Sequence, residues 1–194
     1  YNSFFHTDAV QAVGHYKIDL ISINIDFLSS AAHKFHGPKG VGFTYINKST
    51  KIKSFICGGP QERGLRAGTE SVHNIVGMTK ALEIADKNME QEAKHVLSIK
   101  EYMIDNLRKL FPDIHFNGES GDIKNSTYTI LNVCLPISND KAAMLDFNLD
   151  LKGIACSRGS ACQSGSSEGS HVLDEIQSED QKKFPSVRFS FSHN

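Results

Sequence analysis

The chain has 194 residues, of which 39% are hydrophobic and 22% charged, and its formal net charge at pH 7 is -1. This length can bury the core of one large domain or of two small ones. The nearly balanced charge predicts no basic patch for nucleic acid or an anionic membrane, and no apolar run approaches the length of a bilayer span. The four cysteines include no Cys-x-x-Cys pair, so we expect no structural metal site and free thiols in a reducing cytoplasm.

The first part of the chain predicts short strands separated by turns. Residues 4–8 have a strand pattern that ends at Asp8, and residues 11–14 follow as a turn or short helix. Residues 41–46 and 52–57 are β-branched and aromatic runs bounded by turn residues, which favours strands. Asp8 alone would as often be a helix cap as a functional group, so its role depends on its neighbours in the fold.

The segment SSAAHKFHGPKG, residues 29–40, follows one apolar run, precedes another and contains Lys34. We expect Lys34 to end a buried strand, beside His33 and before a Gly-Pro-Lys-Gly turn. A desolvated amine loses its proton more readily, which makes it a usable nucleophile and a candidate to form a Schiff base. Because lysine is mostly exposed in proteins, a His-Lys pair in a turn would by itself be an ordinary surface feature.

A glycine-rich loop precedes a long helical pattern. Residues 58–69 combine glycines with two arginines, and such a loop before a helix N-terminus suits anions, although most glycine-rich loops are only turns. Apolar residues then recur every three or four positions over residues 70–110, which predicts a helix. The polar stretch 86–94 interrupts the apolar stripe, so we place a domain boundary near residue 88.

The second half of the chain predicts an α+β domain. The expected elements are strands over residues 114–118, 128–136 and 187–192 and a helix over residues 141–149. Residues 153–169 are rich in serine and glycine and contain no long apolar side chain after Ile154. A segment this polar and this long predicts a mobile loop.

Three cysteines of this half have different settings. Cys134 alternates with polar neighbours on a strand pattern, so we expect a buried, inert thiol. Cys156 stands at the base of the polar loop and is expected to finish a strand. Cys162 stands in the middle of the loop and is expected to be reachable, although a cysteine in a loop is by default incidental.

Four segments carry a family resemblance: FFHTDAVQAVG at residues 4–14, SSAAHKFHGPKG at 29–40, SRGSACQSG at 157–165 and VRFS at 187–190. In this order they resemble the cysteine desulfurases, pyridoxal-phosphate (PLP) enzymes of aminotransferase class V with the aspartate-aminotransferase-like fold type I. The resemblance implies an α/β fold in which residues 1–88 are the C-terminal part of the PLP-binding large domain. Residues 89–194 would then be a small α+β domain that carries the mobile loop at about 153–169.

The resemblance implies a role for each matching residue of the cofactor domain. Asp8 would pair with the protonated ring nitrogen of PLP, and Gln11 would bond its phenolic oxygen. His33 would contact the phosphate, and Lys34 would form the Schiff base. Thr69, in a segment that matches the family pattern Arg-x-Gly-Thr, would reach the phosphate held by the partner chain of a homodimer.

The implied reaction is the PLP-dependent conversion of L-cysteine to L-alanine. Arg188 would bind the substrate carboxylate through two parallel hydrogen bonds, which a planar guanidinium can supply and a lysine cannot. The thiolate of Cys162 would take the sulfur as a persulfide. A sulfur-acceptor protein, such as an iron–sulfur cluster scaffold or a partner in transfer-RNA thiolation, would then receive it.

Two features put the cofactor site in doubt. Family members carry a phosphate-binding serine three residues before the lysine, and this chain has Ala31 there. The family's ring-stacking histidine and its main phosphate-binding loop would lie upstream of Tyr1. We therefore expect the 194-residue chain by itself to hold PLP weakly and to be inactive, although the intact protein would be an enzyme.

Alternatives of two kinds stay open at this point. A selenocysteine lyase or another class V PLP aminotransferase would share Asp8, Lys34 and Arg188, whereas a cysteine at position 162 argues against a transaminase. A non-catalytic fragment that dimerises or binds a partner, but cannot hold PLP, would have the same sequence. Formation of alanine from cysteine separates the desulfurase from both.

Overall fold

A computed structural model describes residues 3–138, 141–142, 144–157 and 170–193 of the chain. These residues pack as two compact units, Tyr1–Glu90 and Gln91–Asn194, and each unit is described by itself. The expected assignment of residues 1–88 to a cofactor domain and 89–194 to a small domain stays a prediction. No helix in the described ranges is long and apolar enough to cross a membrane.

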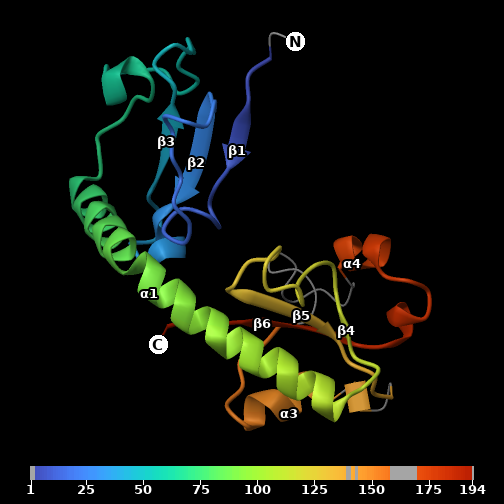
Figure 1. The fold of residues 1–194 in the computed structure, drawn as a ribbon. Helices are drawn as coiled ribbons and strands as arrows, with labels where there is room; N and C mark the ends of the chain where they lie inside the picture. Colours follow the sequence, from blue (N-terminus) through green and yellow to red (C-terminus); the bar gives the residue numbers. More distant parts are fainter. Residues whose placement is uncertain (1–2, 139–140, 143, 158–169, 194) are drawn as a thin grey trace. The chain divides into compact units, whose positions relative to one another are not determined.

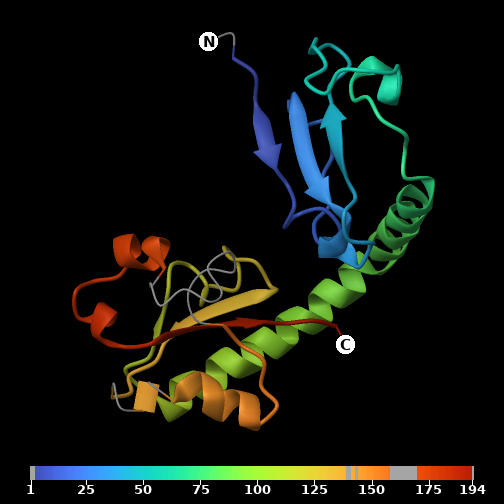
Figure 2. The ribbon, with the colours of Figure 1, turned by 180° about the vertical axis from the view of Figure 1, so that it is seen from behind.

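The first unit is built on a three-stranded sheet in the order β1-β2-β3 (Figures 1 and 2). The strands are β1 His6–Asp8, β2 Phe27–Ala31 and β3 Gly42–Ile46. β1 runs parallel to β2, and β3 runs antiparallel to it. The strand expected over 41–46 is thus confirmed, and the one expected over 4–8 is confirmed in its last three residues.

The core of the first unit forms where β2 meets the helix α1, which extends over Val72–Leu110. Leu28, Ala32 and Phe35 are almost completely buried, and partly buried side chains of α1, including Met78 and Leu82, pack against them. Removing such apolar surface from water is the main favourable contribution to folding. The core therefore holds the segment that follows β2 firmly against the helix.

The strand expected over residues 52–57 is wrong. The backbone there forms no strand, and Phe55 is 97% exposed, with Ile52 and Ile56 at 41% and 49%. A β-branched and aromatic run bounded by turn residues is typical of a strand, but β3 has β2 as its only ladder partner among the described residues. Instead, the Ile56 carbonyl accepts from the Ala67 amide at 3.1 Å and from the Ser54 hydroxyl at 2.7 Å, so this run is bonded within its own loop and not to a strand.

The second unit is also built on a three-stranded sheet, in the order β4-β5-β6 (Figure 1). Its elements are β4 His115–Phe116, β5 Ile130–Cys134, β6 Ser186–Ser190, and the helices α3 Leu145–Leu151 and α4 His171–Ile176. All neighbouring strands are antiparallel. This confirms an α+β second half: the first two expected strands are shortened at both ends, and the third begins one residue earlier and ends two residues earlier than expected.

A lysine occupies a core position of the second unit. Val96, Lys100 and Ile104 form the buried stripe of α1, at the i, i+4, i+8 spacing of one helix face. The Lys100 ammonium donates to Ser126 Oγ and to the carbonyl oxygen of Thr127, each at 2.7 Å. Burial lowers the pKa of Lys100, and the nearby Asp122 carboxylate opposes that shift. The lysine thereby joins the helix to the loop before β5.

We predict that Lys100→Ala lowers the free energy of unfolding by about 2–4 kcal/mol, because it leaves a cavity and removes two hydrogen bonds. Lys100→Met should cost less, about 1 kcal/mol, because it fills the space and buries no charge. Urea unfolding of the chain measures both values. Equal losses for the two variants would contradict this assignment of the side chain.

The same residue predicts a pH dependence. The pKa of Lys100 is lower in the folded chain than its ordinary value of 10.5, so the unfolded chain binds this proton more tightly. The wild type should therefore gain stability relative to Lys100→Met as the pH rises from the lowered pKa toward 10.5. A stability difference that does not change over this alkaline range would contradict the burial of a charged lysine.

Candidate active site

The parallel pairing of β1 with β2 brings two predicted site segments to one edge of the sheet. Asp8 is the last residue of β1 and pairs in register with Ser29 of β2. Just beyond, the amide of Ala9 donates to the Ser29 carbonyl at 2.9 Å. β2 ends at Ala31 and leads directly into the segment that carries Lys34. Carboxyl ends of neighbouring parallel strands are a common location for ligand sites.

Lys34 lies in a single-turn 3-10 helix, η1, Ala32–Phe35. The expectation that this lysine ends a strand is therefore corrected: β2 stops three residues earlier, and the chain turns. Phe35 is 1% exposed and anchors the turn in the core. Lys34 itself is half-buried, and its ammonium makes no hydrogen bond or ion pair with another described residue. The backbone is thus held while the amine is left available.

The turn is closed by tight backbone packing after the lysine. His36 adopts a left-handed conformation, with φ of 65°, and the amide of Gly37 donates to the Ala32 carbonyl at 2.8 Å. A Cβ at Gly37 would lie 2.8 Å from that of Ala32, so only glycine fits this approach. The first glycine of the Gly-Pro-Lys-Gly motif is therefore required by the packing of this turn.

Asp8 and its neighbours are arranged to meet a ligand from solvent. Asp8 is exposed, and its Oδ1 accepts from the amide of Val10 at 2.9 Å. Residues 10–15 form consecutive turns, and Gln11 in these turns, three residues after Asp8, is exposed. His33 is exposed beside Lys34. The structure thus brings four of the predicted cofactor residues to the same edge.

Strand alternation decides which hydroxyl groups face this site. Successive side chains of a strand point to opposite faces, so Asp8, Ser29 and Ala31 share one face and Ser30 lies on the other. Ser30 Oγ is buried and has no hydrogen-bond partner in the described part of the chain. The Ser29 hydroxyl is bonded to His6 Nε2 at 2.9 Å. Neither serine therefore replaces the hydroxyl that Ala31 lacks.

Thr69 belongs to the same unit. It lies in the loop just before α1, far along the sequence from Asp8 and Lys34. It is exposed. The loop before it is held by Gln61, whose Oε1 accepts from the amide of Gly68 at 3.1 Å, and by Arg66, which donates to the Ala67 carbonyl at 2.8 Å. The expected role of Thr69 in a partner's site is not tested by a single chain.

Arg188 belongs to the second unit and lies in the middle of β6. Its backbone pairs with Ser157, with hydrogen bonds of 2.8 and 3.1 Å. Its Nε is buried and has no hydrogen-bond partner among the residues that the structure describes. A buried donor without a partner carries a desolvation cost. The described residues therefore leave this Nε–H unsatisfied.

Three of the four cysteines lie in the part of the chain that the structure describes. Cys162, with Arg158 and the rest of 158–169, lies outside the described residues. Cys134 is buried as expected, and burial raises the pKa of its thiol. Cys57 is exposed, and Cys156 is partly buried and lies outside any strand, so the expectation that it finishes a strand is wrong. These three cysteines form no disulfide among the described residues, and a raised pKa makes Cys134 a poor nucleophile.

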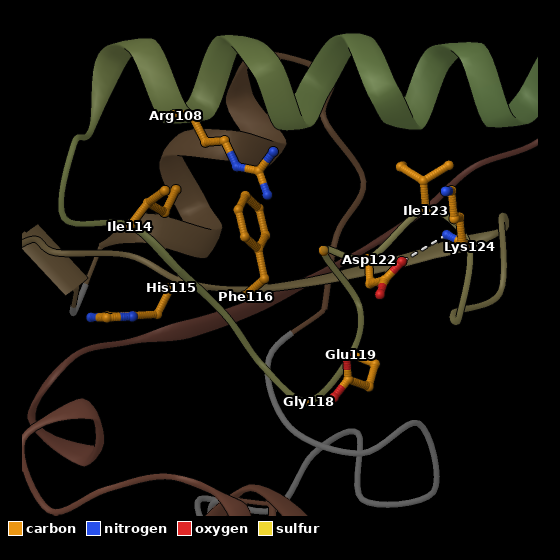
Figure 3. A pocket seen from close by; sticks show the side chains of 10 residues that line it. Arg108, Ile114, His115, Phe116, Gly118, Glu119, Asp122, Ile123 and Lys124 are labelled. Atoms are coloured by element: carbon orange, nitrogen blue, oxygen red, sulfur yellow. Dashed lines mark hydrogen bonds between the residues drawn. The ribbon is translucent and has the colours of Figure 1, made fainter.

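A separate groove of about 670 Å³ lies in the second unit, beside the end of α1 and β4 (Figure 3). The Arg108 guanidinium lies 5.3 Å from the centroid of the Phe116 ring. Hydrogen bonds from the Asn125 side chain and the Lys124 amide lower the pKa of Asp122, which lines the opposite side. Charges of both signs line this groove, and none of its residues belongs to the predicted site.

Comparison with known proteins gives consistent matches over the whole chain. The model of the family "Aminotransferase class-V" matches residues 1–194. The chain is 42% identical over 191 residues to the cysteine desulfurase IscS of Dictyoglomus turgidum, covering 98% of this chain and 47% of that protein. It is 43% identical over 193 residues to a cysteine desulfurase of Bradyrhizobium diazoefficiens, with the same two coverages.

Solved structures match in fold as well. A NifS-like protein is 34% identical with a TM-score of 0.80, over 98% of this chain and 47% of that chain. A structure of SspA in complex with cysteine is 32% identical with a TM-score of 0.71, over 97% of this chain and 50% of that chain. These likenesses confirm the α/β architecture of a PLP fold type I enzyme.

The chain spans about half the length of the curated relatives that it matches. Within that half, the order of the motifs, the edge shared by Asp8 and Lys34, and the family match over residues 1–194 agree. The chain therefore belongs to the class-V aminotransferase family, whose members depend on PLP.

Proposed function

We propose that the protein is a PLP-dependent cysteine desulfurase that converts L-cysteine to L-alanine and leaves a persulfide on Cys162. The observation that carries this proposal is the edge of the first sheet, where Asp8 ends β1 and Lys34 follows the end of the parallel strand β2. The relatives that are named cysteine desulfurases support the choice of substrate. The similar protein SspA, whose structure is a complex with cysteine, supports it as well.

The residues at this edge fit the chemistry of PLP. Asp8 supplies a carboxylate for the protonated ring nitrogen, and Gln11 an amide for the phenolic oxygen. His33 is an exposed donor for the phosphate, and the amine of Lys34 has no other partner among the described residues. When bound, PLP supplies an electron sink for the carbanion that forms at the substrate Cα. Asp8 keeps that sink cationic.

Substrate binding is assigned to Arg188. Its buried Nε–H lacks a partner in the described structure, and a substrate carboxylate would satisfy it through a charge-assisted bidentate pair. Such a pair also fixes the orientation of the amino acid, which a single ammonium could not do. Burial of the Nε–H makes the gain from a carboxylate larger than at an exposed arginine.

The remaining steps use one amine and one thiol. The Lys34 amine takes the proton from the substrate Cα and returns it to the carbon that becomes the alanine methyl, and the proton released when Cys162 ionises is returned to Cα. The Cys162 thiolate attacks the substrate sulfur, so that the bond between sulfur and Cβ breaks and a sulfur–sulfur bond forms. Cysteine and one enzyme thiol thus become alanine and one enzyme persulfide, with no external oxidant.

The protein is proposed to act as a homodimer in which Thr69 serves the partner's cofactor. The stretch around Thr69 exposes Phe55, Ile56, Leu65 and Val72. Exposed apolar side chains in such number are typical of a surface that another chain covers. The persulfide is proposed to pass to an acceptor protein of iron–sulfur cluster assembly or transfer-RNA thiolation, which fits the name IscS of several relatives.

We predict that Cys162→Ser lowers alanine formation from cysteine by a factor of about 100 or more, because it removes the sulfur acceptor. Cys156→Ser is the matched control and should retain most of the activity. After turnover, peptide mass spectrometry of the protein as it is made in the cell should locate one extra sulfur atom on Cys162. The extra sulfur on Cys57, Cys134 or Cys156 instead would refute the assignment.

We further predict that Ala31→Ser tightens PLP binding about tenfold or more, because it restores one charge-assisted hydrogen bond worth about 1.5–3 kcal/mol. Ser30→Ala should leave PLP affinity unchanged, since its hydroxyl lies on the other face, and should slightly stabilise the fold by removing an unpartnered group. Absorbance titration with PLP measures the affinities. If Ser30→Ala weakened binding as much as Ala31→Ser strengthened it, the assignment of faces would be wrong.

A further inference from the structure

We infer that His15 is a positioning residue for Lys34: its Nε2–H donates to the Lys34 carbonyl and fixes the lysine relative to Asp8 and Gln11. The inference rests on the proposed function, because it concerns the residues assigned to hold PLP. The family resemblance assigned no role to His15, and its sequence position, one residue after the motif FFHTDAVQAVG, gave no signal.

The contact itself joins two segments that are 19 residues apart. His15 Nε2 lies 3.3 Å from the carbonyl oxygen of Lys34, in a partly buried setting. This carbonyl belongs to the end of a single-turn helix, where carbonyl groups have no partner within the helix. A side-chain donor at this point therefore satisfies a group that the turn leaves open and restrains the backbone of the reactive lysine.

Gly14, the residue before His15, allows its segment to approach η1 closely. Gly14 has φ of 83°, a region that favours glycine. A Cβ at this position would lie only 2.6 Å from the Cβ of Phe35. The 14–15 backbone is thus in direct contact with the residue after the lysine. Two neighbouring contacts, one apolar and one polar, hold the turn against η1.

The other end of the same segment is fixed by the sheet. Asp8 pairs with Ser29, and the amide of Ala9 donates to the Ser29 carbonyl at 2.9 Å. Between these ends, the amide of Val13 donates to the carbonyl of Ala9, also at 2.9 Å. Residues 8–15 therefore bridge the strand and the lysine turn, so that the spacing of Asp8, Gln11 and Lys34 is set by contacts at both ends.

The chemistry of the bond specifies what His15 can do. A carbonyl oxygen only accepts hydrogen bonds, so Nε2 must carry a proton, as it does in the imidazolium ion and in one neutral tautomer. The bond therefore needs a donor at this position but no proton transfer. Glutamine can place its amide nitrogen close to the position of Nε2, whereas methionine fills similar space without a donor.

The test compares His15→Met with His15→Gln in the protein as it is made in the cell, with His95→Met as a control on an exposed helical histidine. Without PLP, hydrogen exchange of the amides of residues 33–37 should accelerate about tenfold in His15→Met, the loss of one typical hydrogen bond. With PLP, kcat should fall about tenfold while the KM for cysteine changes less than about twofold, as misplacement of a reacting group predicts.

His15→Gln should restore both the exchange rates and kcat to within about threefold of the wild type, because it keeps the donor. Wild-type exchange in His15→Met, or a His15→Gln variant as impaired as His15→Met, would overturn the inference. If the exchange rates follow the prediction but no variant forms alanine from cysteine, the positioning role stands and the proposed function fails. The exchange readout thus separates the two.

Discussion

The candidate site depends on one constraint, the parallel ladder between β1 and β2. Because the two strands run in the same direction, the ends that carry Asp8 and the Lys34 turn lie at the same edge of the sheet. An antiparallel pairing would place them at opposite edges. The turn over residues 9–15 and the buried Phe35 then hold both segments in place. The ladder thus brings together the residues proposed to hold PLP, whereas Arg188 belongs to the second unit and Cys162 lies outside the described residues.

Most buried polar side chains in the described residues have a hydrogen-bond partner. Lys100 is completely buried but donates two short hydrogen bonds, and Asn117 is bonded to Asn132 and Ser186. Arg188 Nε and Ser30 Oγ are the buried side-chain atoms without partners in the described ranges. For the first, we propose a substrate carboxylate as the partner. The second is explained by nothing in the structure and costs stability.

Much of the fold could be predicted from the sequence because its strands and its long helix have regular apolar spacing. The strand predicted over residues 52–57 was wrong because a β-branched and aromatic composition cannot show whether a neighbouring strand exists. The position of Lys34 was predicted from its motif, but its 3-10 turn was not, since glycine and proline mark a turn without giving its type. His15 could not be predicted, because its partner is a backbone carbonyl and such contacts leave no pattern in the sequence.

The proposed chemistry requires that the edge of the first sheet is a PLP site with Lys34 as the reactive amine. Borohydride reduction in the presence of PLP fixes the cofactor to the lysine that binds it, and peptide mass spectrometry identifies that lysine. We expect the label on Lys34 in the wild type and its loss in Lys34→Ala. A label spread over exposed lysines such as Lys39, with none on Lys34, would contradict this assignment.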